Sequence, residues 1–135
     1  GFVFQGFNLI SRTSALDNVA LPMIYKGVPE EERYKRAREA LEIVGLKNRE
    51  NHMPNQMSGG QQQRVAIARA LITDAKYILA DEPTGNLDKE NRRKIVELLQ
   101  QIAHEQDRCV IVVTHSDYVK KKCDICYEMG DDDEE

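Results

Sequence analysis

The feature that most constrains the fold is a run of four apolar residues, Tyr77 to Ala80, that ends in Asp81-Glu82-Pro83. A continuous apolar run without alternating polar residues predicts a strand that is buried in a parallel sheet. The two acids and the proline that follow predict a turn at the end of the strand. We therefore expect an α/β fold that includes this strand.

Strands and helices alternate around this run in the second half of the chain. The other elements expected there are a helix at Lys89–His104, a strand at Cys109–Val113, a short helix near Asp117–Lys122 and a last strand around Ile125–Met129. The first half is mostly helical, and its expected elements are a strand at Phe2–Phe4, a short or kinked helix around Pro22, a helix at Glu30–Val44, a loop at 46–57 and a helix at Gln61–Ile72. This order predicts a mostly helical lobe inserted into, or leaning on, a parallel α/β core.

Length and composition limit the class of protein. The 135 residues are 41% hydrophobic and 31% charged, which fits a soluble domain or two small lobes sharing a core. No apolar run approaches the roughly 18 residues of a membrane span, and Gly1 begins no recognisable secretory leader. Because the sequence opens without a methionine, we expect it to be a piece of a longer protein.

Charge and cysteine content narrow the function further. Residues 131–135 are all acidic and are expected to form a solvated, disordered tail, whereas the other 19 basic and 18 acidic residues nearly balance. Bulk charge therefore gives no support for nucleic-acid binding. Three cysteines, an odd number, favour a reducing compartment. The Cys123-x-x-Cys126 pair lacks the second pair that a zinc site needs.

Two motifs carry residues suited to phosphate chemistry. Met57-Ser58-Gly59-Gly60-Gln61-Gln62 precedes a helix, where free backbone N–H groups attract an anion, although an ordinary loop and N-cap would give the same pattern. Asp81 and Glu82 end a strand, where open α/β sheets bind ligands. There one acid can hold Mg²⁺ while the next faces an attacking water, although both acids could instead be solvated or cap a helix.

In this order, and with a histidine after the next strand, the motifs resemble the nucleotide-binding domains of ABC transporters. The matching segments are Phe4-Gln5 with the Q-loop, Met57–Gln61 with the signature sequence, Tyr77–Asp81 with the Walker B strand, Glu82 with the catalytic position, Gly85–Asp88 with the D-loop and His115 with the switch histidine of the H-loop. Residues 83–88 and 6–9 look most like the lipoprotein-releasing and macrolide-export branch.

The resemblance implies an ATP site shared between two domains packed head to tail. Glu82 is implied to be the general base and His115 to hold the γ-phosphate, while Asp81 and Gln5 are implied to contact Mg²⁺ directly or through water. Two of these residues have simpler explanations, because Gln5 could close a strand and His115 could be an ordinary strand-end histidine.

The remaining site residues are implied to act between subunits. Asp88 is implied to bridge the two domains, although it could simply be the N-cap of the helix that begins at Lys89. The signature residues implied to contact the ATP of the opposite subunit are Ser58, Gly59, Gly60 and Gln61.

The resemblance also implies a fold and its division into parts. It predicts a partial P-loop NTPase-type parallel sheet core with an α-helical signature subdomain. The predicted parts are a core strand at 1–5 leading into the Q-loop, the α-helical signature subdomain at 6–72, the α/β core at 73–130 with Walker B, D-loop and H-loop, and the acidic tail at 131–135.

One family element is missing from the sequence, the phosphate-binding P-loop GxxxxGK[ST]. In the family this loop precedes the Q-loop and supplies most of the phosphate contacts. We therefore expect this chain alone to bind ATP weakly or not at all and not to turn it over. Strands missing from its core would expose apolar surface, so we also expect dimers or larger species.

The implied function is Mg²⁺-dependent ATP hydrolysis that drives transport, at the cytoplasmic face of a membrane. The implied partners are a transmembrane permease and a second nucleotide-binding domain, without nucleic acid. An ABC-type ATPase of the DNA-repair or chromosome-structure kind would insert long coiled coils, whereas the 53 positions from Gln5 to Ser58 hold no sustained heptads. Two further functions stay open: a soluble ABC-type factor acting on ribosomes, and a non-enzymatic module that offers its signature to a complete partner.

Overall fold

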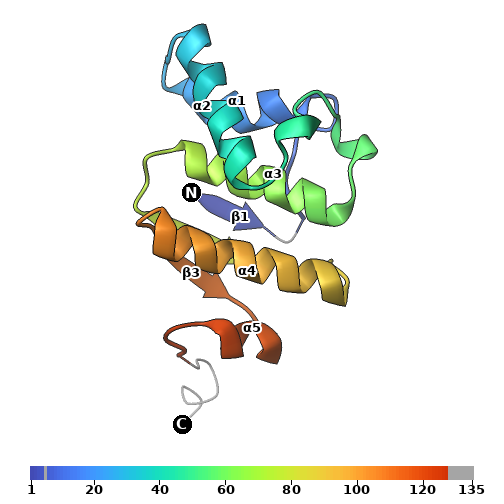
Figure 1. Cartoon of the computed structure of the whole chain (residues 1–135), viewed down its shortest axis with the longest axis vertical. Coiled ribbons are helices and arrows are strands. Elements are labelled where there is room, and N and C mark those ends of the chain that lie inside the picture. The colour runs from blue at the N-terminus through green and yellow to red at the C-terminus, as the bar shows by residue number, and fades with distance from the viewer. Residues whose placement is uncertain (5, 128–135) are drawn as a thin grey trace.

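The computed structural model describes residues 1–4 and 6–127 (Figure 1). Its elements in chain order are β1 (Phe2–Phe4), α1 (Ala15–Tyr25), α2 (Glu30–Ile43), the 3-10 turns η1 (Lys47–Arg49) and η2 (Pro54–Gln56), α3 (Gly59–Ile72), β2 (Tyr77–Asp81), α4 (Lys89–Glu105), β3 (Cys109–Val113) and α5 (Asp117–Lys122). The strands form one parallel sheet in the order β1-β2-β3. The predicted α/β class is confirmed.

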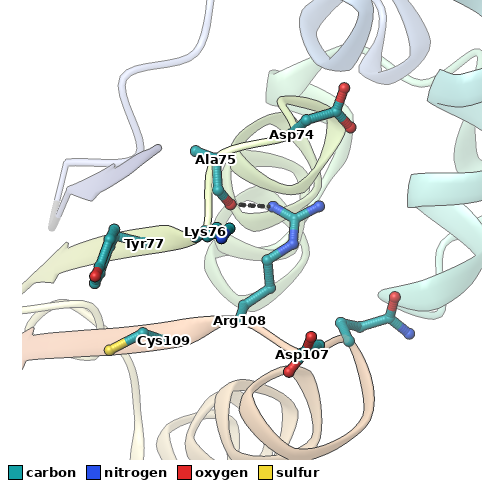
Figure 2. A pocket seen from close by; sticks show the side chains of 8 residues that line it. Asp74, Ala75, Lys76, Tyr77, Asp107, Arg108 and Cys109 are labelled. Carbon is teal, nitrogen blue, oxygen red and sulfur yellow. Dashed lines mark hydrogen bonds between the residues drawn. The ribbon is translucent and has the colours of Figure 1, made fainter.

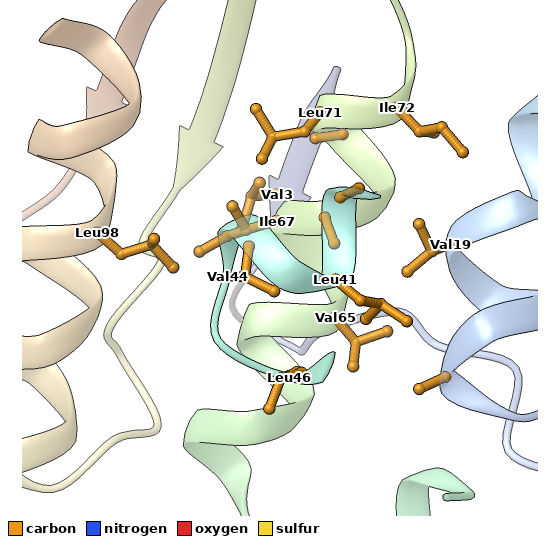
Figure 3. Close-up of a cluster of buried hydrophobic side chains, with 14 of the residues drawn as sticks. Val3, Val19, Leu41, Val44, Leu46, Val65, Ile67, Leu71, Ile72 and Leu98 are labelled. Atoms are coloured by element: carbon orange, nitrogen blue, oxygen red, sulfur yellow. The ribbon is translucent and has the colours of Figure 1, made fainter. Parts of the chain in front are cut away.

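The helices of the first half gather at one end of the molecule, with α5 at the other end (Figure 1). Helix α3 packs against α1, α2, α4 and strand β1, so it joins the helical group to the sheet. Figure 3 shows the buried side chains at this junction, among them Val3 of β1, Val19 of α1, Leu41 of α2 and Ile67 of α3. This arrangement places the start of α3, with its glycine pair, at the edge of the core.

Helix α4 is held to the sheet by one apolar stripe. Its buried residues recur at helical spacing and are Ile95, Val96, Leu98, Leu99 and Ile102. They pack with the inward-facing residues of the strands, which include Val3, Ile78 and Ala80, fully buried, and Val110 and Val112, partly buried. The register pairs Val3 with Ala80 and Ile78 with Val110, so these side chains share one face of the sheet.

The opposite face of the sheet is uncovered in the part of the chain that the structure describes. Phe2 is 58% exposed, Tyr77 63%, Ile111 46% and Val113 53%. The strand at Tyr77–Asp81 is parallel as predicted, but the expectation of a buried strand holds only for one face. A side chain is buried by its neighbours, and here α3 and α4 cover the same side of the sheet.

Helix α1 around Pro22 is short, as predicted, with 11 residues, and burial of Asn18, Val19 and Met23 stabilises it despite the missing proline N–H. Two other predicted elements need correction. Within the predicted last strand, the described residues 125–127 form no strand and are exposed, whereas 128–129 lie outside the described residues. The acidic tail at 131–135 also lies outside them. Helix α3 begins two residues earlier than predicted, at Gly59.

Candidate functional site

Glu82 lies where the ends of β2 and β3 meet. Its backbone N–H donates to Val113 O at 2.8 Å, which ties the turn after β2 to the end of β3. Its carboxylate accepts twice, at Oε1 from the backbone N–H of His115 at 2.7 Å and at Oε2 from Thr114 Oγ1 at 3.3 Å. The side chain is 24% exposed. Each oxygen therefore has a fixed position and still has lone pairs for a further donor.

The backbone of Glu82 adopts a left-handed conformation, with φ of 45°. A side chain other than glycine rarely adopts this region, and such residues are concentrated at functional sites. The turn is closed behind it by Gly85, whose N–H donates to Glu82 O at 3.1 Å. The fixed position of this carboxylate is thus accompanied by an unfavourable backbone conformation.

Asp81 is the last residue of β2 and is exposed. It stands opposite Phe4 and Val113 in the sheet register, so it shares the uncovered face with them. No group of three or more acidic, histidine or cysteine side chains that could hold a metal occurs among the described residues. One free carboxylate fits Mg²⁺, which is commonly bound through one or two carboxylates together with substrate phosphates and water.

The His115 side chain is fully exposed, with Nε2 4.0 Å from Glu82 Oε1. The structure therefore brings together three of the predicted residues, Asp81, Glu82 and His115, at the carboxyl ends of neighbouring strands. Gln5 lies outside the described residues. Its neighbour Phe4 pairs with Asp81 in the register, so the chain reaches this same edge of the sheet immediately before residue 5.

The signature residues form the start of helix α3. Ser58 Oγ accepts from the N–H of Gln61 at 3.2 Å, and Gln61 Oε1 accepts from the N–H of Ser58 at 3.0 Å, which is a reciprocal capping box. Ser58 is exposed. The N-cap that the sequence allowed is therefore present, and its residue Ser58 is open to solvent, whereas Gly59 is partly buried and Gly60 is buried.

Close packing explains why residues 59 and 60 are glycines. A Cβ at Gly60 would lie 2.6 Å from Asn91 Oδ1, and one at Gly59 would lie 3.4 Å from Leu87 Cδ2. The start of α3 thus packs closely against the segment that leads into α4. Asp88 caps α4, because its Oδ1 accepts from the N–H of Asn91 at 2.8 Å. The structure therefore places the signature residues close to the segment of Asp88. The hydrogen bonds that hold Glu82 come from a different segment, Thr114 and His115.

Sequence reasoning missed two polar side chains of α3 that reach the site. Gln63 is fully buried and donates to Phe4 O and Pro83 O. Arg69 donates to Asn8 O at 2.8 Å and to Phe7 O at 3.3 Å, and burial lowers the pKa of its guanidinium. The available signal for Gln63 was its position, since it shares the inward stripe of α3 with Ile67 and Ala70.

A hollow lies away from these residues, at the amino ends of β2 and β3 (Figure 2). It has a volume of about 560 Å³ and is lined by residues 74–77 and 106–109. Arg108 beside it donates to Thr73 O, Ala75 O and Leu71 O at 2.9–3.0 Å, which fixes the end of α3. The Arg108 guanidinium is thus hydrogen-bonded to three backbone carbonyls and has a structural role at this hollow.

Residues 1–85 match the sequence model of the ABC transporter family. The chain belongs to this family. It is 60% identical over 116 residues to an uncharacterized ABC transporter ATP-binding protein of Thermotoga maritima, covering 86% of this chain and 49% of that protein. It is 47% identical over 131 residues to the macrolide export ATP-binding/permease protein MacB of Aggregatibacter actinomycetemcomitans, covering 97% of this chain and 20% of the relative.

Solved ABC cassettes share the fold. The dimeric, post-hydrolysis structure of the ATP-binding cassette MJ0796 with ADP and phosphate superposes with a TM-score of 0.76 and 51% identity, covering 90% of this chain and 54% of that chain. This ABC transporter chain thus spans about half the length of the ATP-binding relatives that it matches. Within the described residues, no helix has both the length and the apolar character needed to cross a membrane.

Proposed function

We propose that the chain forms part of an ABC-type ATPase domain in which Glu82 is the general base for ATP hydrolysis. The observation that carries this proposal is the geometry of Glu82, with a left-handed backbone and with each carboxylate oxygen bonded to one of the two residues that follow β3. Phosphoryl transfer depends mainly on positioning and charge neutralisation, and a fixed carboxylate can orient a water and accept its proton. His115, exposed beside Glu82, is proposed to hold the γ-phosphate.

Asp81 and Gln5 are proposed to hold Mg²⁺. The support is the exposed carboxylate of Asp81 at the carboxyl end of β2 and the position of Phe4 opposite it. Bound Mg²⁺ would neutralise phosphate charge. The oxygen donors of these two side chains suit this hard cation.

A second copy of the domain is proposed to complete the site. Ser58, Gly59, Gly60 and Gln61 would contact ATP held by the opposite subunit, and Asp88 would bridge the two. The exposed Ser58 at the start of α3 supports this proposal, since a helix N-terminus favours an anion. Similarity to a dimeric cassette supports the pairing.

The proposed division of the chain follows these roles. Residues 1–5 form a core strand and the start of the Q-loop, 6–72 the signature subdomain, 73–130 the α/β core and 131–135 the tail. A permease partner and a place at the cytoplasmic face of the membrane are proposed from relatives whose names include a permease. The exposed apolar residues of α1, Ile24 and Tyr25, lie in the subdomain that would meet this partner.

The test is Glu82→Gln in the protein expressed from its complete coding sequence. The substitution keeps the shape of the side chain but removes the base, so we expect kcat to fall by about a hundredfold or more while Mg-ATP binding is retained. Glu97→Gln is the matched control, because Glu97 forms an exposed ion pair with Arg93 on α4. Wild-type turnover by the Glu82→Gln protein would show that another residue is the base.

A second candidate is a module that offers its signature to a complete partner domain. It is favoured by the exposed Ser58 at the start of α3. Mixing the chain with an intact domain that carries a Glu-to-Gln change at its catalytic position tests it. ATP-dependent association supports the module, and its absence under saturating ATP argues against it.

A further inference from the structure

Gln63 connects two segments that are far apart in the sequence, the end of β1 and the turn after β2. Its Nε2 donates to Phe4 O at 3.3 Å and also to Pro83 O, while none of the residue is exposed. Both partners are carbonyls, which only accept, so the amide must turn its nitrogen toward them. Each Nε2 hydrogen thus has a partner on a different segment.

These two carbonyls belong to the proposed site. Phe4 ends β1 and directly precedes Gln5, and Pro83 directly follows Glu82. Gln63 itself lies on α3, the helix that begins with the signature residues. One buried amide therefore joins the signature helix to the segment before the proposed Mg²⁺ ligand and to the turn that carries the proposed base.

Helix α3 holds the first of these segments at a second point. Arg69 donates to Phe7 O and Asn8 O, at two consecutive residues with left-handed backbones, φ of 63° and 58°. Phe7 also donates its N–H to Phe4 O at 3.1 Å. Helix α3 thus holds Phe4 through Gln63, and Phe7 and Asn8 through Arg69.

The buried amide has a visible cost. Gln63 Oε1 is buried without a hydrogen-bond partner in the part of the chain that the structure describes, which is unfavourable in a core. The neighbouring inward-facing residues of α3, such as Ile67 and Ala70, are apolar. An apolar side chain would avoid this cost but would leave both carbonyls without this donor.

We propose that Gln63 is a positioning residue for ATP hydrolysis, which couples movement of the signature helix to Glu82 and to the segment before Gln5. The proposal rests on the proposed ATPase function. A shift of α3, such as contact with a nucleotide at its N-terminus would cause, is transmitted through this amide to the end of β1 and to the turn after β2. Gln63 touches no reacting group and acts only through Phe4 and Pro83.

The test compares Gln63→Leu with Gln63→Glu in the protein expressed from its complete coding sequence. Leucine removes the donor, and the ionised glutamate turns a carboxylate toward two carbonyl oxygens. Gln100→Leu is the matched control, because Gln100 Nε2 donates to a single backbone carbonyl, that of Lys122, at 2.8 Å and far from both segments.

The first readout is turnover. We expect Gln63→Leu to lower kcat by about tenfold, while KM for Mg-ATP changes less than about twofold and the Gln100→Leu protein resembles the wild type. For Gln63→Glu the ratio of its kcat to the wild-type kcat should rise between pH 8 and pH 6, because the protonated acid regains one donor and burial favours protonation. Wild-type kcat for a folded Gln63→Leu protein would overturn the proposal, as would a pH-independent ratio for Gln63→Glu.

The second readout is independent of activity. Amide hydrogen exchange reports on Phe7 N–H, bonded to Phe4 O, and on Gly85 N–H, bonded to Glu82 O. We expect Gln63→Leu to speed exchange at both by about tenfold, with Leu79 N–H in β2 unchanged. Unchanged exchange, or equal acceleration at Leu79 from general loss of stability, would overturn the proposal. A wild-type protein without ATPase activity would contradict the proposed function, and exchange alone would then decide the coupling.

Discussion

At the scale of single residues, the candidate site contains one position that requires a glycine because of space and one that has a side chain in a backbone conformation typical of glycine. Among the described glycines, Gly27 and Gly45 have positive φ, whereas Gly60 does not. Gly60 is required by space, because a Cβ there would meet Asn91 Oδ1 at 2.6 Å. Glu82 has the reverse situation, with a side chain at a φ of 45° that glycine would adopt without strain. A glycine at 82 would relieve strain and lose the carboxylate.

Gly60→Ala is therefore expected to lower the free energy of unfolding by about 1–2 kcal/mol, since Asn91 must leave its position. Urea denaturation measures this cost. In an Asn91→Ala background most of it should disappear, because the contacting atoms are gone. Gly6→Ala is the control, as no heavy atom lies within 4 Å of a Cβ there. An equal cost in both backgrounds would mean that packing against Asn91 is not the reason for the glycine.

The sequence could predict which residue types gather at the strand ends, but not how they are held. Asp81, Glu82 and His115 follow from apolar runs that stop at polar residues, because parallel strands end at one edge. The φ of Glu82 and the two bonds of Gln63 depend on backbone atoms brought together from distant segments. A polar residue in an apolar stripe, such as Gln63, indicates that a hydrogen-bond partner is needed, but the sequence does not indicate which group is that partner.

At the scale of elements, sequence patterns predicted every helix and strand of the described chain apart from the short 3-10 turns, and also a last strand that the described residues 125–127 do not form. Helices α2 and α4 end within one residue of their predicted limits, since caps and stripes are local signals. Burial of the sheet was not predictable in the same way. Strand β3 reads as uniformly apolar, yet Ile111 and Val113 are exposed because what covers a face is decided by other elements.

The pairing of α1 with α2 includes one bond whose strength depends on pH. Tyr34 on α2 donates its O–H to Asp17 Oδ1 on α1 at 2.7 Å. This hydrogen bond to a carboxylate raises the pKa of Tyr34 above its ordinary value of 10.0. A raised pKa in the folded state means that the fold favours the neutral phenol, so this contribution is present below pH 10 and is lost as the phenol ionises.

Tyr34→Phe removes the donor and is expected to lower the free energy of unfolding by roughly 1 kcal/mol at pH 7. The difference between the two proteins should shrink as the pH rises above about 10, because ionised tyrosine no longer donates. Thermal unfolding of both proteins from pH 7 to pH 11 checks this. A difference that stays constant over that range would indicate lost packing instead of the lost bond.

At the scale of the whole molecule, the 135-residue chain contains the residues proposed as the base, the Mg²⁺ ligands and the signature contacts, but no GxxxxGK[ST]. Backbone N–H groups and the lysine of that loop supply most of the contacts to nucleotide phosphates. We therefore expect isothermal titration of this chain with Mg-ATP to give weak binding or none, and no turnover. Micromolar affinity would contradict this expectation and would show that Asp81, Glu82 and His115 suffice to bind the nucleotide.

The uncovered face of the sheet determines how the chain behaves alone. Phe2 and Phe4 of β1 stack there with ring centroids 5.9 Å apart, and Ile111 and Val113 of β3 are exposed on the same face, across β2. A contiguous apolar face of this kind favours association, so we expect dimers or larger species at micromolar concentration. Phe2→Lys combined with Val113→Lys should shift the chain toward monomer in light scattering, because two cations on each face repel and resist burial.

The control for this experiment lies on another surface. Tyr25 on α1 is 83% exposed, away from the sheet, and Tyr25→Lys adds a charge without touching the uncovered face. This variant should associate like the unmodified chain, so that loss of association in the double variant is not an effect of net charge alone. A clean monomer for the unmodified chain would instead mean that the exposed part of Phe2, Tyr77 and Val113 is too small or too interrupted by Asp81 to bury a partner.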